Sequence, residues 1–300
     1  MVTPPLRRAV VQEVMDVHGF SERHACDVTG FARSSQRYQA RRRSYAELSM
    51  RLAALAGDRP RFGYRRLHIM LGREGFKANH KLVYRLYRLA GLKLRGKRGK
   101  RRCGERRGKP LPPIAINDRW SMDFVSDRLV DGRAFRAFAV VDDVSKRCVV
   151  IEVDTSLPGL RVIRALEQAI DCYGKPNRLV MDNGPEFTSR AFLAWVQRRG
   201  IEPCWIDPGK PIQNAYAESF NSRFRDECLN QHVFTTVADA RALIEGWRVD
   251  YNSLRPHSSL GGLAPDDFSA SQAGGVPPSS EALMCSSPEE QQIQTPRRLT

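Results

Sequence analysis

The chain has 300 residues, of which 41% are hydrophobic, and a formal net charge of +16. This length predicts two or three domains, and because no apolar run reaches 18 residues we expect no membrane contact. The N-terminus lacks a basic-then-apolar signal peptide, which indicates a cytoplasmic protein. The seven cysteines form no C-x-x-C pair, which argues against a disulfide framework or a zinc ribbon.

The positive charge is concentrated in the first third of the chain. Residues 1–112 contain 28 lysines and arginines against 8 acids, whereas residues 113–300 contain 21 against 25. A surplus this lopsided favours a polyanionic partner over an ordinary solvated surface. In the cytoplasm that partner is nucleic acid.

Residues 1–43 have the pattern of a helix-turn-helix. A first helix over residues 6–17 places Leu6, Val10, Val14 and Val17 on one face, and Gly19 ends it. A second helix runs from a Ser21 cap to Gly30, and a third begins at Ser34 or Ser35. We expect the third helix to enter the major groove of DNA. Its candidate contacts are Arg37, Arg41 and Arg42. The alternative is an ordinary small helical bundle.

Residues 44–92 form a second helix-turn-helix-like region. Asn79 is placed to cap its last helix. Leu82, Leu86 and Leu89 are expected to face inward there. The outward face is then basic and a candidate for binding DNA, with Lys81, Arg85 and Arg88.

Two segments have compositions that cannot bury a core. Residues 93–112 are a basic linker, which either neutralises phosphates or serves as a solubilising spacer. Its candidate DNA contacts are Lys97, Arg98, Lys100, Arg101 and Arg102. Residues 271–300 are rich in Ser, Pro, Gly, Glu and Gln, and predict a disordered tail.

From residue 113 to 270 the pattern is that of an α/β (α+β) domain in the order β-β-β-α-β-α-β-α. Asp123 lies in an apolar strand (WSMDFV), Asp182 follows a buried strand (RLVMD), and Glu218 lies on a later helix. Carboxylates from three elements can converge on one point. Such a group is typical of a Mg²⁺ site, because this cation takes oxygen ligands. Three carboxylates about 4 Å apart repel by roughly 4 kcal/mol per contact, which a divalent metal offsets.

The helix that carries Glu218 is expected over residues 212–230. Asn214, Glu218, Ser222 and Arg225 share one face of it. Asn214 and Arg225 are therefore candidate DNA contacts, although Arg225 has acidic neighbours with which to pair instead. Asp142 is expected to have a turn role rather than to bind metal. Glu186 is expected to cap a helix or contact substrate.

Five motifs in order carry a resemblance to a known family. They are WSMDFV, VVDD, MDNGPEF, PIQNAYAESFNSRFRDECLN and YNSLRPHSSLGGLAPDDF, over about residues 118–268. Together they resemble the RNase H-like catalytic core of retroviral integrases and DDE transposases. The chain is most similar to bacterial insertion-sequence transposases of the orfB type. Retroviral integrases begin with a zinc domain, whereas this chain begins with helix-turn-helix signals, as the bacterial branch does.

The resemblance implies an RNase H-like integrase core preceded by an all-α helix-turn-helix region. It also implies the catalytic and metal ligands Asp123, Asp182 and Glu218. Mg²⁺, for which Mn²⁺ can substitute, would support cleavage at the element ends and joining of the 3′-OH ends to target DNA. The implied partners are the terminal inverted repeats, target DNA and further copies of the chain, with an upstream helix-turn-helix product in some members as a frameshift fusion. The implied location is the bacterial cytoplasm, in association with the nucleoid.

Two other functions stay open from the residues alone. One is a nuclease of the same fold, which hydrolyses DNA without joining it. The other is a sequence-specific DNA-binding protein with a degenerate core. A tyrosine recombinase is disfavoured, because the chain lacks the Arg…His-x-x-Arg…Tyr arrangement.

Overall fold

The computed structural model describes residues 3–38, 44–92, 94, 113–207 and 214–272. The chain divides into two compact units, residues 1–48 and 49–300, each of which is described by itself. Several predicted features lie outside the described residues: the tail after residue 272, nearly all of the basic linker, and the candidate contacts Arg41, Arg42, Lys97, Arg98, Lys100, Arg101 and Arg102.

The first unit contains the helices α1 (Pro4–His18), α2 (Glu22–Thr29) and α3 (Arg33–Arg37). The predicted cap is present, since the Ser21 hydroxyl accepts from the His24 amide. The predicted apolar face of α1 was wrong at Leu6 and Val17, which are 55% and 69% exposed, whereas Val14 packs against the small core as predicted. Val11 is the buried residue instead, since α2 and α3 pack around that side of α1.

Helix α4 (Ala46–Asp58) spans the boundary between the units, and α5 (Tyr64–Arg73) and α6 (His80–Leu89) follow it. The Asn79 side chain caps α6 as predicted, accepting from the Lys81 amide. Val83 and Tyr87 are the buried residues of α6, and the inward position predicted for Leu89 was wrong, because this side chain is 77% exposed.

A five-stranded sheet forms the centre of the second unit. Its strands are β1 (Arg119–Arg128), β2 (Ala134–Asp142), β3 (Cys148–Asp154), β4 (Arg178–Met181) and β5 (Glu202–Trp205), in the spatial order β3-β2-β1-β4-β5. β1, β2 and β3 pair antiparallel, whereas β4 is parallel to both β1 and β5. Gly132 closes the β1–β2 hairpin at φ +85°, a conformation that glycine adopts without a steric penalty. The predicted order of elements along the chain, with three antiparallel strands followed by alternating helices and strands, is confirmed.

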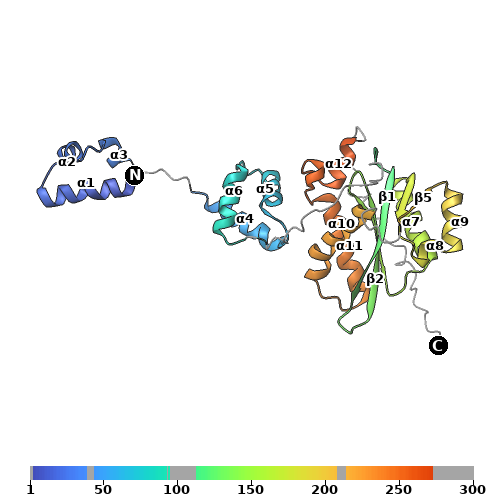
Figure 1. Ribbon diagram of the computed structural model, residues 1–300. Coiled ribbons are helices and arrows are strands. Elements are labelled where there is room, and N and C mark those ends of the chain that lie inside the picture. The colour runs from blue at the N-terminus through green and yellow to red at the C-terminus, as the bar shows by residue number, and fades with distance from the viewer. Residues whose placement is uncertain (1–2, 39–43, 93, 95–112, 208–213, 273–300) are drawn as a thin grey trace, which may run out of the picture. The chain divides into compact units, whose positions relative to one another are not determined.

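Helices cover both faces of this sheet (Figure 1). On one side lie α7 (Gly159–Tyr173), α8 (Pro185–Thr188) and α9 (Arg190–Arg199). On the other lie α10 (Ala215–Glu227) and α11 (Val237–Ser253), and α12 (Pro265–Gln272) packs on α11. Short 3₁₀ turns, η2 (Leu229–Gln231) and η3 (Ser258–Leu260), connect these C-terminal helices. No helix in the described part of the chain is long and apolar enough to cross a membrane.

The alternation of side chains along β1 divides the interior into two cores. Trp120 and Met122 are buried in the core beneath α7 and α9. Val125 is buried in the other core, with Phe220 and Phe224 of α10. Because successive strand residues point to opposite faces, Asp123 shares the face of Val125. The sequence pattern of β1 therefore directs its one mid-strand acid toward α10.

Candidate active site

Asp123 lies at the middle of the central strand, half-buried beneath α10. Its Oδ1 accepts from the Phe124 amide at 2.8 Å, and its Oδ2 accepts from Asn221 Nδ2 at 2.8 Å. Burial raises the pKa of the Asp123 carboxyl, and the negative charges of Asp182 and Glu218 raise it further, against the opposing effect of the two hydrogen bonds. Asp182 and Glu218 therefore lie close enough to act on Asp123 electrostatically.

Strand pairing places Asp182 next to Asp123. Ser121 of β1 pairs with Val180 of β4 in parallel register. Continuing that register by two residues brings Asp182, the residue directly after β4, opposite Asp123. Adjacent strands lie about 4.8 Å apart, so the two acids occupy neighbouring positions at the end of β4.

Gly184 allows the chain to turn closely around Asp182. The Gly184 amide donates to Asp182 Oδ1 at 3.0 Å. A Cβ at position 184 would lie 2.9 Å from the same oxygen and 3.2 Å from Glu186 Oε2. A side chain at this position would therefore fit only if the Asp182 carboxylate moved aside.

Glu218 projects from the first turn of α10, a helix that packs along β1. Asn214 Nδ2 donates to the Met122 carbonyl at 3.2 Å, and Arg225 donates to the Ser126 carbonyl at 3.3 Å. Asn221, one turn after Glu218, makes the bond to Asp123. These contacts fix α10 against β1, and Glu218 is exposed on it.

The donor set fits a hard divalent cation, but the side chains do not already surround one point. Within the described residues, no three Asp, Glu, His or Cys side chains are close enough to hold a metal ion together. The candidate oxygen donors are the three carboxylates and the buried Oδ1 atoms of Asn214 and Asn221, neither of which has a hydrogen-bond partner among the residues that the structure describes. Oxygens of these two kinds are the ligands that Mg²⁺ prefers.

The other acids near the site have structural partners. Asp142 accepts from the amides of Asn117, Val144 and Ser145, which organises the turn after β2. Glu186 pairs with Arg136. Both arrangements differ from that of a metal ligand, whose oxygens must be available to the cation.

Asp143 and Arg119 form a buried ion pair at 2.5 Å, and Ser121 donates to the same carboxylate at 2.9 Å. Burial raises the pKa of Asp143 to about 6, although both partners oppose the rise. On the first turn of α10, the Tyr216 ring lies 5.3 Å from the Arg119 guanidinium and 4.0 Å from Lys146 Nζ. This cluster joins α10 to the strands behind the acids.

The candidate DNA contacts fall into different environments. Lys81, Arg85 and Arg88 are exposed on α6, as expected. Arg37 pairs with Glu22 at 2.7 Å, and its side chain remains 61% exposed. Asn214 is only 4% exposed, which favours its hydrogen bond to β1 over a contact with DNA.

Asn221 is the residue that the sequence prediction missed. It lies three positions after Glu218 and therefore on a neighbouring face of the same helix. That spacing is the only signal in the sequence that could have found it.

Known families match along most of the chain. The integrase core domain matches at residues 115–211 and again at residues 199–265, and an HTH-like domain matches at residues 45–102. A protein of insertion element IS407 from Burkholderia multivorans is 51% identical over 83% of this chain and 91% of its own length. The chain belongs to this family of insertion-element proteins with an integrase core.

A more distant relative agrees with this assignment. A putative transposase of insertion sequence element IS150 from Escherichia coli is 26% identical over 75% of this chain and 83% of its own length. The HTLV-2 integrase catalytic core domain, solved in complex with magnesium, is 19% identical, with a TM-score of 0.43, over 52% of this chain and 97% of that one. Membership of the integrase-core family agrees with the RNase H-like arrangement of the sheet and its helices.

Proposed function

We propose that this protein is a Mg²⁺-dependent DDE transposase, with Asp123, Asp182 and Glu218 as its catalytic acids and metal ligands. The observation that carries the proposal is the strand register, which places Asp182 beside the half-buried Asp123 of the central strand; burial and the charges of Asp182 and Glu218 also raise the pKa of Asp123. Perturbed carboxyl groups gathered from separate elements are typical of catalytic sites. Membership of a family of insertion-element proteins makes DNA the substrate.

The residues of the chain prepare the site in three ways. Asn221 orients the Asp123 carboxylate and stabilises its charged form by a hydrogen bond. Gly184 holds the turn that carries Asp182 close to β1. The contacts of Asn214 and Arg225 with β1 fix the helix that presents Glu218.

When bound, Mg²⁺ supplies charge stabilisation at the scissile phosphate and lowers the pKa of an attacking hydroxyl. Mn²⁺ accepts the same oxygen ligands. The exposed position of Glu218 leaves the site open on the side from which a DNA backbone would approach.

The implied partners follow from the same assignment. The exposed basic face of α6 is proposed to bind the element ends, together with Arg37, Arg41 and Arg42 of the first unit and the basic residues of 93–112. Two ends must be brought together for transposition, so we propose a homo-oligomer on DNA in the bacterial cytoplasm, associated with the nucleoid. Production as a fusion with an upstream helix-turn-helix product stays a prediction.

The test is cleavage and strand transfer by the full chain on DNA that carries the element ends. Glu218→Gln should abolish both reactions and leave end binding unchanged in a gel-shift assay. Glu202→Gln is the matched control, because it neutralises an exposed acid on the edge strand β5. Cleavage retained by Glu218→Gln would remove Glu218 from the site. If the native chain cleaves the ends but does not join them, it would instead be a nuclease.

A further inference from the structure

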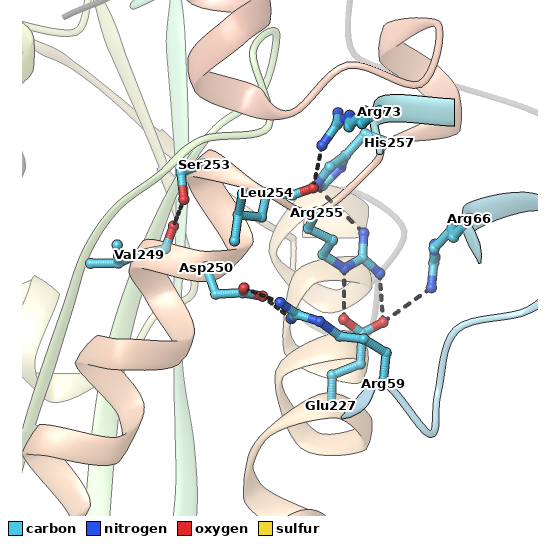
Figure 2. Close-up of polar contacts among 10 residues, drawn as sticks. All are labelled: Arg59, Arg66, Arg73, Glu227, Val249, Asp250, Ser253, Leu254, Arg255 and His257. Carbon is cyan, nitrogen blue, oxygen red and sulfur yellow. Dashed lines mark hydrogen bonds and ion pairs between the residues drawn. The ribbon is translucent and has the colours of Figure 1, made fainter. Parts of the chain in front are cut away.

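Three arginines of the α4–α6 region bind the C-terminal helices of the core (Figure 2). Arg59, between α4 and α5, makes a two-point ion pair with Asp250 of α11. Arg66 of α5 contacts Glu227 at 3.2 Å. Arg73, the last residue of α5, donates to the carbonyl oxygens of Leu254 at 2.7 Å and Gly262 at 3.2 Å. The two carbonyls belong to the segment after α11.

The contacts of Arg59, Arg66 and Arg73 form a seam between α4–α6 and the C-terminal segments of the core. Glu227 connects this seam to the helix that carries Glu218. It is the last residue of α10 and accepts two hydrogen bonds from Arg255, each at 2.6 Å, in addition to the contact with Arg66. Arg255 is 2% exposed. Beside it, burial and the nearby arginines lower the pKa of His257 to about 2, so this imidazole is neutral. Among the described residues, Glu227 is the acid that pairs with both Arg66 and Arg255.

Charge pairs and apolar contacts both contribute to the seam. A cavity of about 540 Å³ lies at it, with Arg59, Arg73 and Leu254 in its lining. Apolar contact comes from the Phe62 ring, 5.9 Å from the Arg255 guanidinium, and from Ile69, whose Cδ1 would lie 3.0 Å from a Cβ at Gly262. Because charge pairs contribute to the contact, it should weaken at high salt, to the extent that these half-buried pairs are screened.

Docking leaves the basic face of α6 accessible. Lys81, Arg85 and Arg88 are all exposed, and within the described residues none of the three has an acidic partner. Arg59, Arg66 and Arg73 therefore bind the core, whereas the basic residues of α6 face solvent.

We propose that Arg59, Arg66 and Arg73 form a latch that fixes α4–α6 on the core while the basic face of α6 stays open. A DNA segment bound by that face is then held at one spacing from the acids beneath α10. The spacing effect rests on the proposed function, whereas the latch itself does not.

The latch can be tested without catalysis, by the distance between spin labels in the full chain. Labels at Met50 of α4 and at Val233 of the core, both exposed, report the separation of the two parts once the other accessible cysteines are replaced. The native chain should give one narrow distance distribution that broadens at high salt. Arg59→Ala should increase the open fraction roughly tenfold, the effect of losing one charge-assisted pair.

Two further variants sharpen this test. Arg61→Ala removes an exposed arginine of the same loop and should leave the distribution narrow. The double variant Arg59→Asp with Asp250→Arg should restore the narrow distribution, because it rebuilds the pair with its charges exchanged. A broad native distribution at low salt, or equal effects of Arg59→Ala and Arg61→Ala, would overturn the latch.

The spacing effect needs a DNA readout. On an end-containing duplex, Arg59→Ala should bind within about twofold of the native chain, but cleave at additional phosphodiester positions. The Arg61→Ala control should cleave only at the native position. If the latch opens in the spin-label experiment and the cleavage position does not change, the spacing role is wrong although the latch stands. If the native chain cleaves no DNA at all, the proposed function is wrong, and the spin-label result still stands.

Discussion

Replacing Asn221 by alanine should weaken Mg²⁺ binding without removing any of the three acids. The Asn221 side chain donates to Asp123 Oδ2 at 2.8 Å and stabilises the ionised carboxylate. A hydrogen bond to a charged group contributes about 1.5–3 kcal/mol. Because each 1.4 kcal/mol corresponds to a factor of ten in an equilibrium constant, a proton should bind Asp123 about ten- to hundred-fold more tightly in the variant, and Mg²⁺ binding should weaken by up to that factor at the pH values where the proton competes.

The sign of the pH dependence follows from the Asp123 carboxyl. Its pKa is raised in the folded chain, so a proton competes with the metal, and Mg²⁺ binding should strengthen as the pH rises. Loss of the Asn221 bond raises the pKa of Asp123 further. The variant should therefore recover part of its Mg²⁺ affinity at alkaline pH, where the carboxyl loses its proton even without the bond.

The assay is thermal unfolding of the full chain in a Mg²⁺ titration at several pH values. Gln231→Ala is the matched control, since it removes an exposed amide that bonds the Asp226 carbonyl on the segment after α10. An Asn221→Ala chain with the native Mg²⁺ affinity at every pH would refute the role given to this bond.

Three other predictions follow from the same geometry. Gly184→Ala should reduce cleavage at least tenfold with little loss of stability, because its Cβ would displace the Asp182 carboxylate. Gly57→Ala is the control, since a Cβ at this position of α4 meets open space. Native activity of Gly184→Ala would contradict the proposed turn. Asp143 has a folded-state pKa near 6, above its usual value, so its stabilising contribution is present at low pH and lost as the pH rises from about 4 to 6. The destabilisation caused by Asp143→Asn in urea unfolding should therefore be about 1 kcal/mol larger at pH 5 than at pH 7, and a pH-independent difference would contradict this. Deleting residues 1–112 should abolish specific end binding and flatten the salt dependence of DNA affinity; an unchanged slope in gel-shift titrations would move the main phosphate contacts to the core.

The strands and their order could be predicted because their signals are local. Apolar runs such as that around Asp123 and the turn at Gly132 identify the β1–β2 hairpin without knowledge of distant residues. The helix faces were less predictable. In the small helical regions, the packing of neighbouring helices decides which of several apolar residues is buried, so Val11 is enclosed whereas Leu6 is not.

The contacts of the site depend on long-range geometry and were predictable only in part. The resemblance to known transposases identified the three acids, whose roles stay a proposal. Asn221 was missed because an amide on a polar helix carries no distinctive pattern until its partner strand is known. The pairing of Arg59 with Asp250 joins residues 191 positions apart, and ion pairs of this kind have no sequence periodicity.

The two-sided packing of β1 has a consequence for how this protein tolerates change. The neighbours of Asp123 along the strand pack into the interior on one side of the sheet or the other, so inserting a single residue ahead of it would turn either the residues before the insertion or those after it to the wrong face. Buried apolar side chains such as Trp120, which lie on the opposite face of the sheet from Asp123, thereby fix the direction in which the Asp123 carboxylate points. Substitutions tolerated in this strand should therefore be those that keep its length and the alternation of its side chains between the two cores.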